Sequence, residues 1–233
     1  MSNFVQLLNS HPLTLIMSLP GNKPDLAVAA LDAGADVLKV HINVEHRASG
    51  LKMGSLEEER ARLERILSLA GERKTPVGIV PGAFPGAWGP EMRELELMGF
   101  DFYSIYAHEL GAHALTSTSM TGMVAGDHTY RQAEFEAMAL APFGIIEASV
   151  VEGEGYGKPL SWRDLLHYKN IVDWTGKPVV VPTQRRIRVE DLAALRWSGI
   201  RGLMLGAIVT GREASTVYQA VREFRAAIDS EGR

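Results

Sequence analysis

The sequence of 233 residues contains no cysteine. Disulfide bridges and thiolate metal sites are therefore excluded, and a chain without cysteine suits a reducing compartment such as the cytoplasm. Basic residues are not in excess either, because 24 lysines and arginines stand against 28 aspartates and glutamates, for a formal net charge of −4. A nucleic-acid-binding protein needs a strongly basic face, so we expect no nucleic-acid partner.

Long apolar runs are also missing. The longest ones are interrupted within about ten residues, which is too short to span a bilayer. The first 19 residues carry neither a basic start nor a small-residue cleavage site, so the sequence predicts no signal peptide. We therefore expect a cytoplasmic protein with no membrane partner, and the sequence is compatible with a homo-oligomer.

What the sequence does contain is an alternation of short β-rich runs and helical stretches, repeated eight times. In three places a helix ends at a glycine and a buried strand follows: ALDAGADVLKV, ELMGFDFYSI and LRWSGIRGLML. Repeated βαβ units with right-handed crossovers form a parallel sheet. Because 233 residues is close to the roughly 250 of one α/β barrel, we predict an α/β fold, a single (β/α)8 TIM barrel domain over residues 1–233.

The expected strands are residues 13–19, 37–44, 76–80, 102–107, 122–125, 144–151, 178–182 and 202–209. A short helix is expected over residues 111–117. The alternative fold is an open doubly wound sheet. It is disfavoured because eight evenly spaced units exceed what open sheets usually need, and because no G-x-G-x-x-G follows the first strand.

The second expected strand indicates which side chains a barrel would point inward. Alternate strand residues of a barrel face the interior or the surrounding helices, and the set that faces the helices must be apolar. The even-numbered residues from 38 to 44 are apolar, which leaves the inward set Val37, Lys39, His41 and Asn43. Three polar side chains on one inward face are unfavourable unless they are paired or functional. We therefore take them as candidates for catalysis and substrate binding.

The sixth expected strand repeats this pattern with Glu147 and Ser149. Lys39 and Glu147 come from opposite sides of the ring, so both can reach the barrel axis. They form either a buried structural ion pair or an acid–base pair whose pKa values are tuned by burial and pairing. His41 is equally compatible with a satisfied core histidine and a catalytic one. His108, at the C-terminal end of the fourth strand, stands where barrel active sites lie.

The last two expected strands predict a phosphate site. Many barrels hold a phosphate between the loops after these strands and a short helix, where backbone amides and the helix dipole favour an anion. Gly206 would let the backbone approach the anion, Ala207 would donate its amide, and Gln184 and Arg185 stand beside them. A guanidinium suits phosphate oxygens. Tight packing between strands is the alternative reason for Gly206.

The sequence predicts neither a metal nor a cofactor. It lacks the H-E-x-x-H motif, and its polar candidates are scattered over several strands. The glycine-rich run VEGEGYGKP, residues 151–159, is not a P-loop, because Pro159 stands where a serine or threonine should follow Lys158. This run predicts a flexible loop that can close over a substrate.

Two segments resemble a known family. Residues 179–211 (VVVPTQRRIRVEDLAALRWSGIRGLMLGAIVTG) resemble the last two units of ribulose-phosphate-binding barrels, and residues 15–40 (LIMSLPGNKPDLAVAALDAGADVLKV) are similar in layout to their first unit. Within that superfamily the similarity is nearest to the N-acetylmannosamine-6-phosphate 2-epimerase branch. The resemblance implies a (β/α)8 fold and a phosphate site near Gly206.

The catalytic pattern of that branch is not matched here. In the epimerases a lysine ends the third strand, whereas this sequence has Val80 and Pro81. Their seventh strand ends in an acidic residue followed by glycine, whereas Thr183 and Gln184 stand here. The resemblance therefore implies the fold and the phosphate site, but not that specific epimerase activity.

Three functional hypotheses follow. The first is an isomerase or epimerase that acts on a small phosphorylated sugar-like metabolite by acid–base proton transfer. Glu147 would be its base, with Lys39 or His108 as acid or oxyanion stabiliser. The second is a carbon–carbon lyase, or aldolase, in which Lys39 forms a Schiff base with a carbonyl substrate. The third is a non-catalytic ligand-binding barrel, which the unmatched catalytic pattern favours.

Overall fold

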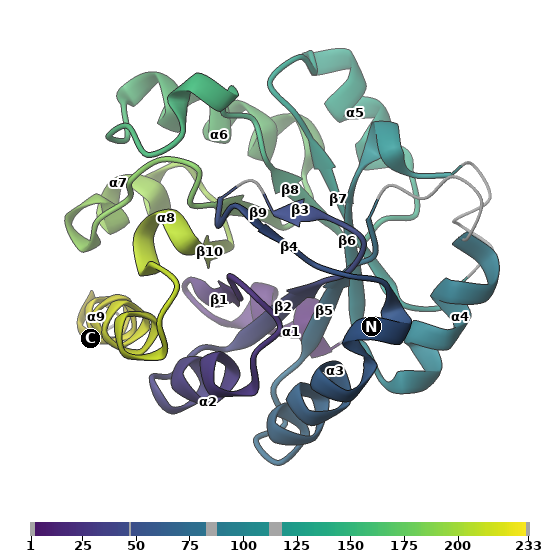
Figure 1. Cartoon of the computed structure of the whole chain (residues 1–233). Coiled ribbons are helices and arrows are strands. Elements are labelled where there is room, and N and C mark those ends of the chain that lie inside the picture. Colours follow the sequence, from purple (N-terminus) through teal and green to yellow (C-terminus); the bar gives the residue numbers. More distant parts are fainter. Residues whose placement is uncertain (1–2, 47, 83–87, 112–117, 232–233) are drawn as a thin grey trace.

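The computed structural model of the chain describes residues 3–46, 48–82, 88–111 and 118–231. Eight parallel strands close into a barrel in the order β1-β10-β9-β8-β7-β6-β5-β2 (Figure 1). The barrel strands are β1 (Thr14–Ser18), β2 (Val37–His41), β5 (Val77–Val80), β6 (Phe102–Tyr106), β7 (Thr121–Gly126), β8 (Ile145–Ala148), β9 (Val179–Pro182) and β10 (Gly202–Leu205). The predicted (β/α)8 barrel is thereby confirmed. The helix expected over residues 111–117 falls, apart from Gly111, outside the described residues.

Helices form a ring around the barrel, and the two-stranded hairpin of β3 and β4 lies across its mouth (Figure 1). The hairpin strands are β3 (Glu45–His46) and β4 (Leu51–Lys52). The longer helices are α1 (Asn3–Ser10), α2 (Pro24–Asp32), α3 (Leu56–Gly71), α4 (Trp88–Met98), α5 (Gln132–Leu140), α6 (Trp162–Thr175) and α9 (Ala214–Glu231). The shorter ones are α7 (Leu192–Trp197), α8 (Ala207–Thr210), η1 (Ala107–Glu109), η3 (Gly153–Gly155) and η4 (Val189–Asp191).

The amino-terminal half of the barrel interior is apolar and closed. Inward-facing residues of the strands form one cluster there: Ile16, Val37, Phe102, Met123, Ile145, Val180 and Met204. Phe4 and Leu8 of α1 belong to the same cluster and are fully buried. The ring of Phe4 lies 4.4 Å from that of Phe102, at the start of β6. Helix α1 therefore closes the amino-terminal end of the barrel, and access from solvent is left to the opposite end.

A glycine on β5 makes room for this apolar layer. A Cβ atom at Gly78 would lie only 2.1 Å from the ring of Phe102, and no real Cβ contact is that short. Because Phe102 also packs on Phe4, its ring has little room to move. Any side chain at position 78 must therefore displace the ring of Phe102 from the apolar layer.

We expect Gly78→Ala to lower the free energy of unfolding by about 2–3 kcal/mol, because overpacking a dense core forces side chains from their preferred rotamers. Gly71→Ala is a matched control, since a Cβ there meets nothing within 4 Å in the last turn of α3. Alanine is the better helix former, so the control should leave stability unchanged or raise it by up to about 1 kcal/mol. Urea denaturation measures both variants, and equal stability of the two would contradict this packing.

Three strands end at least three residues earlier than the sequence predicted. β8 stops at Ala148 rather than at residue 151. β2 stops at His41 rather than at residue 44, because Asn43 adopts a left-handed conformation with φ of 54°. β10 stops at Leu205 rather than at residue 209, because the amide of Gly206 bonds to Thr183 Oγ1 at 2.9 Å. Residues 207–210 then form α8 instead of continuing the strand.

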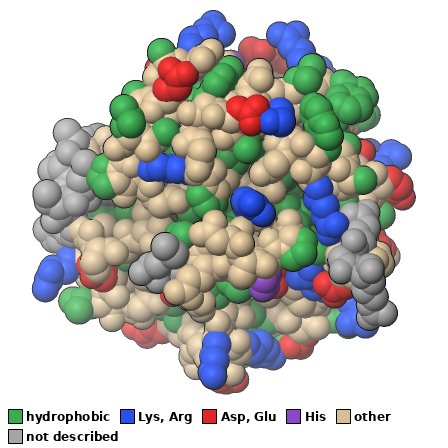
Figure 2. All heavy atoms as spheres, turned by 180° about the vertical axis from the view of Figure 1, so that it is seen from behind, with side chains coloured by type: hydrophobic (Ala, Val, Ile, Leu, Met, Phe, Trp, Pro, Cys, Tyr) green, Lys and Arg blue, Asp and Glu red, His purple; other side chains and the backbone are tan. Residues whose placement is uncertain are grey.

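Charged residues of both signs are interspersed on the face of the molecule opposite the hairpin, where apolar side chains lie between them (Figure 2). Within the described ranges, no helix combines the length and the apolar character that crossing a bilayer requires.

Candidate active site

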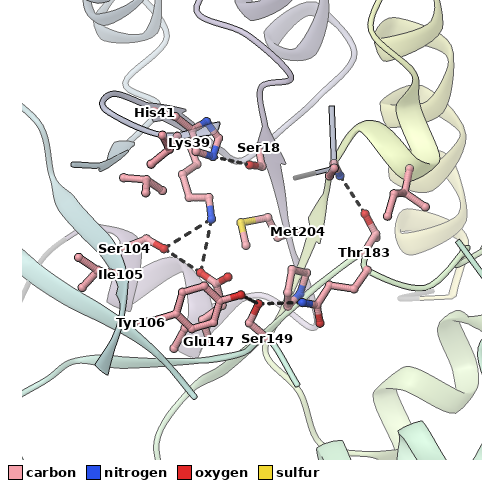
Figure 3. Close-up of a pocket in the computed structure, with 18 of the residues that line it drawn as sticks. Ser18, Lys39, His41, Ser104, Ile105, Tyr106, Glu147, Ser149, Thr183 and Met204 are labelled. Atoms are coloured by element: carbon pink, nitrogen blue, oxygen red, sulfur yellow. Dashed lines mark hydrogen bonds and ion pairs between the residues drawn. The ribbon is translucent and has the colours of Figure 1, made fainter. Parts of the chain in front are cut away.

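A pocket of about 260 Å³ lies in the carboxyl-terminal half of the barrel, above the apolar layer (Figure 3). Its lining includes six of the ten residues predicted for the site: Lys39, His41, Glu147, Ser149, Gln184 and Gly206. Other residues complete its walls, among them Ser18, Val80, Ser104, Tyr106, Ala125, Pro182 and Thr183. The polar side chains predicted to face the barrel axis on β2 and β8 therefore meet in one cavity.

A buried ion pair forms the floor of this pocket. Lys39 Nζ lies 3.4 Å from Glu147 Oε2, and the two side chains are only 7% and 8% exposed. Ser104 Oγ donates to the same carboxylate oxygen at 2.8 Å and lies 3.5 Å from Lys39 Nζ. A lysine, a carboxylate and a hydroxyl thus converge from three different strands. Together these three side chains can remove a proton from a molecule bound above them, deliver one to it, or stabilise a negative charge on it.

A small residue on β7 lets β6 and β8 reach each other. These two strands are not neighbours, because β7 lies between them. Ala125 of β7 stands level with Tyr106 on one side and with Glu147 on the other. Its side chain is too short to separate them, so residues of β6 and β8 touch across the cavity in two successive layers. The lower contact is between Ser104 and Glu147, and the upper one is between Tyr106 and Ser149.

His41 is held at the pocket wall by its backbone. Its amide donates to Asn22 Oδ1 at 3.2 Å, and its carbonyl accepts from Asn22 Nδ2 at 2.6 Å. Asn22 Nδ2 also donates to the buried carboxylate of Glu59. The imidazole Nε2 lies 3.4 Å from Ser18 Oγ. His41 therefore faces the same cavity as the ion pair, on a backbone fixed by the loop after β1.

A second hydrogen-bonded group occupies the other wall. Tyr106 OH and Ser149 Oγ are 2.8 Å apart, and Gln184 Nε2 donates to Ser149 Oγ at 2.9 Å. The same Nε2 donates to Tyr156 OH at 2.7 Å. This joins β6, the ends of β8 and β9, and the glycine-rich loop after β8. The hydroxyls of Ser149 and Tyr156 on this wall are therefore both held by Gln184.

The end of β10 leaves open space beside the pocket. The nearest protein atom to a Cβ at Gly206 would be Thr183 Oγ1 at 3.8 Å, an ordinary contact distance. Tight strand packing, the alternative reason for this glycine, is therefore wrong. Ala207 begins α8 directly after it, and Ile208 of α8 lines the pocket. The first amides of a helix have no partners within the helix, so they can bind an acceptor.

Ala207, the first residue of α8, is absent from the pocket lining, and three other residues predicted for the site lie elsewhere. Asn43 was expected to point inward on a strand, but it stands beyond the end of β2, and its Nδ2 donates to the carbonyl of Pro81 at 3.1 Å. It turns the chain so that the hairpin of β3 and β4 can cover the mouth. Val44, Glu45 and Ala48 of this connection line the pocket from above.

Arg185 is the second. Its guanidinium lies outside the pocket lining, where Nη2 meets Asp164 Oδ1 at 2.9 Å and Nη1 donates to the carbonyl of Gly155 at 2.9 Å. The guanidinium is therefore engaged by protein partners outside the pocket that was predicted to hold the phosphate. It fastens the glycine-rich loop to the start of α6 instead. That loop is also held by the amide of Gly157, which donates to the carbonyl of Gln184.

His108 is the third. It belongs to η1 after β6, with a half-exposed side chain stacked on Tyr106 and 3.7 Å from Asp127. Burial acts to raise the pKa of Asp127, but hydrogen bonds from Thr129 and the charges of His108 and His128 outweigh it, so this pKa is lowered. His108 therefore lies beside Asp127 and Tyr106, outside the pocket lining.

Sequence reasoning missed several residues that line the pocket. Ser18 and Thr183 lie at strand ends, and the period-two pattern of a strand could have identified Ser18. Tyr156 lies in the loop after β8, where no periodic pattern indicates the direction of a side chain. Glu109 was missed as well, and together with Glu45 it adds two carboxylates to the lining. Among the residues that the structure describes, no group of three or more His, Asp or Glu is placed to hold a metal ion.

No protein-family model matches this sequence, and no curated protein matches it. Solved structures share its fold. A chain of tryptophan synthase from Mycobacterium tuberculosis has a TM-score of 0.75 and 15% identity, over 97% of this chain and 98% of that one. KGPDC from Streptococcus mutans has a TM-score of 0.69 and 15% identity over 94% and 99%. Thiamine phosphate pyrophosphorylase from Pyrococcus furiosus has a TM-score of 0.66 and 13% identity over 94% and 97%. These similarities confirm the (β/α)8 fold expected from the resemblance to ribulose-phosphate-binding barrels.

Proposed function

We propose that this protein is an isomerase or epimerase that acts on a small phosphorylated sugar-like metabolite. The observation that carries the proposal is the ion pair of Lys39 and Glu147, buried at the floor of an open pocket at the carboxyl-terminal end of the barrel. Barrel enzymes place their catalytic groups at this end. Burying a charged pair costs desolvation free energy that the mutual attraction often does not offset, so a buried pair beside a cavity is a candidate for chemistry.

In this proposal Glu147 is the base and removes a proton from the carbon next to a carbonyl group. The ammonium of Lys39, 3.4 Å from the carboxylate, stabilises the negative charge that develops on the enediolate. Ser104, which donates to Glu147, keeps the carboxylate in place. Return of the proton by Glu147 to the former carbonyl carbon, while the hydroxyl proton passes to the former carbonyl oxygen, gives an isomer. An epimer instead requires a second proton donor on the opposite face of the carbon from Glu147.

The phosphate would lie at the start of α8. Gly206 leaves space there, and the amides of Ala207 and Ile208 stand at the amino-terminal end of the helix. The lining of the pocket is otherwise rich in carboxylates, with Glu45 and Glu109 as well as Glu147. An anion is therefore best placed at the α8 end, away from these side chains. The name of one structural neighbour, a thiamine phosphate pyrophosphorylase, is in line with a phosphate ligand.

The experiment is a screen of aldose and ketose phosphates, including N-acetylhexosamine 6-phosphates, by proton NMR. The proposal expects interconversion of one pair of isomers or epimers. A molecule that binds but stays intact after long incubation would support a binding barrel instead. No change in any compound would overturn the proposed activity.

Reduction with borohydride distinguishes the lyase hypothesis from the proposed isomerase, because it traps a Schiff base as a stable adduct. A Schiff base needs Lys39 Nζ to attack the carbonyl carbon, but this atom is already engaged by Glu147 Oε2 at 3.4 Å and lies 3.5 Å from Ser104 Oγ. We therefore expect no covalent adduct on Lys39 when the protein is treated with borohydride in the presence of substrate. Mass spectrometry measures the outcome, and a stable adduct at Lys39 would replace proton transfer by carbon–carbon bond chemistry.

A further inference from the structure

The carboxamide of Gln184 has a defined orientation. The backbone amide of Val151 donates to Gln184 Oε1 at 3.0 Å, and Gln184 is only 6% exposed. An N–H group needs an acceptor opposite it, so the oxygen and the nitrogen of this carboxamide cannot be exchanged. Its Nε2 must therefore face Ser149 Oγ and Tyr156 OH, at 2.9 and 2.7 Å. Both protons of Nε2 are used by these two contacts.

This orientation decides what Tyr156 can do. A phenol oxygen carries one proton and can also accept hydrogen bonds. Because Gln184 donates to it, the oxygen of Tyr156 is an acceptor in that contact, and its proton must be directed elsewhere. Tyr156 lines the pocket, and its hydroxyl contacts Gln184, which lines the same pocket. Val151 and Gln184 together therefore leave the proton of Tyr156 available to a molecule bound in the pocket.

The loop that carries Tyr156 is fastened at several points. Gly157 N donates to the carbonyl of Gln184 at 2.9 Å, and Arg186 N donates to the carbonyl of Lys158 at 2.9 Å. Arg185 holds the carbonyl of Gly155 and is itself paired with Asp164. The phenol is thus placed by its backbone as well as by Gln184. Such a preorganised donor loses little freedom when a ligand binds.

We propose that Tyr156 determines specificity for a carbonyl-bearing substrate by donating a hydrogen bond to its carbonyl oxygen. This inference rests on the proposed function and identifies the residue that polarises the carbonyl group of the substrate. When Glu147 takes the proton, the pair of electrons of the C–H bond forms the C=C bond of the enediolate, and the carbonyl π pair moves onto the oxygen that Tyr156 holds. A donor matches this oxygen in both states and more strongly in the charged one. The corresponding alcohol gains less, because it carries no developing charge.

The test uses inert probes that differ only at one end: aldonate phosphates, whose carboxylate imitates the enediolate, and alditol phosphates of the same carbon number. Calorimetry gives the ratio of their affinities for the wild-type protein and for variants. Tyr156→Phe should reduce the preference for the aldonate about tenfold, the effect of one hydrogen bond to a charged group, with alditol affinity changed by less than about twofold. Tyr218→Phe, which removes a partly exposed phenol from α9, should leave the preference unchanged.

Gln184→Glu examines the orientation itself. Glutamate can still accept from Val151, but it offers an acceptor to Tyr156, so the phenol proton turns away from the ligand. We expect about the same tenfold loss of preference, and a further loss of less than about threefold when the change is made in Tyr156→Phe. If the added charge alone repelled the carboxylate, the full loss would also occur in Tyr156→Phe, and the inference would be wrong. Circular dichroism verifies that each variant is folded.

The outcomes separate this inference from the proposed function. An unchanged preference in Tyr156→Phe overturns the role of Tyr156 while phosphorylated probes still bind. If probes with and without phosphate bind equally well, the phosphate site proposed at the start of α8 is wrong. The preference measured with unphosphorylated aldonates and alditols then decides the role of Tyr156. A complete lack of binding by all probes overturns both.

Discussion

Replacing Glu147 by glutamine should lower kcat by about 10²- to 10⁴-fold, the usual contribution of a positioned general base. Glutamine keeps the shape of the side chain and can still accept from Ser104, but it cannot take a proton. KM should change far less than kcat, because the group acts mainly in the transition state. Steady-state kinetics on the isomer pair identified by the NMR screen measures both constants.

Ser104→Ala is the matched control for this variant. It removes a hydrogen bond to Glu147 but leaves the direct contact of the carboxylate with Lys39, so we expect a loss in kcat below about tenfold. An equal loss of kcat in both variants would mean that activity depends on how the side chains at the base of the pocket are arranged, and not on the carboxylate of Glu147 itself. Full activity in Glu147→Gln would remove the base from the proposed mechanism.

The second large expected effect is on the stability of the protein when the ion pair of Lys39 and Glu147 is broken. Lys39→Met leaves the carboxylate of Glu147 buried without its cation, and losing one partner of a buried pair lowers the free energy of unfolding by on the order of 3 kcal/mol. The double variant Lys39→Met/Glu147→Leu removes both charges. Apolar replacements of buried pairs are often neutral or stabilising, so it should regain most of the lost stability while remaining inactive.

Chemical denaturation of the wild-type protein, the two single variants and the double variant measures this cycle. Recovery in the double variant would mean that the pair is not needed for folding and is retained for what it does in the pocket. A double variant no more stable than the weaker single variant would instead indicate a structural ion pair, the alternative that the sequence left open.

The barrel and the members of its inner face could be predicted from sequence because both depend on local periodicity. Helix ends marked by glycine and followed by buried runs indicate βαβ units, and a period of two separates Lys39 and His41 from their apolar neighbours. The same rule placed Glu147 and Ser149 in the pocket. These predictions needed no knowledge of distant contacts.

The strand ends and the loops were beyond such reasoning. Asn43 leaves the strand because its left-handed backbone is stabilised by contacts with Pro81, 38 residues further on. The guanidinium of Arg185 forms an ion pair with Asp164 in the first turn of α6, and no local sequence pattern indicates that pairing. Tyr156 lies in a loop, and only the hydrogen bond from Gln184 shows which way its hydroxyl acts. Side chains governed by distant partners therefore had to be read from the structure.

Deuterium exchange tests the role of the buried pair most directly. The substrate is incubated in deuterated water with the wild-type protein and with Glu147→Gln, and NMR follows the hydrogen on the carbon next to the carbonyl group. Glu147 as the base predicts that this hydrogen is replaced by deuterium with the wild-type protein and is retained with Glu147→Gln. Exchange at equal rates with both proteins, or turnover by Glu147→Gln at the wild-type rate, would contradict proton transfer by Glu147 in this pocket.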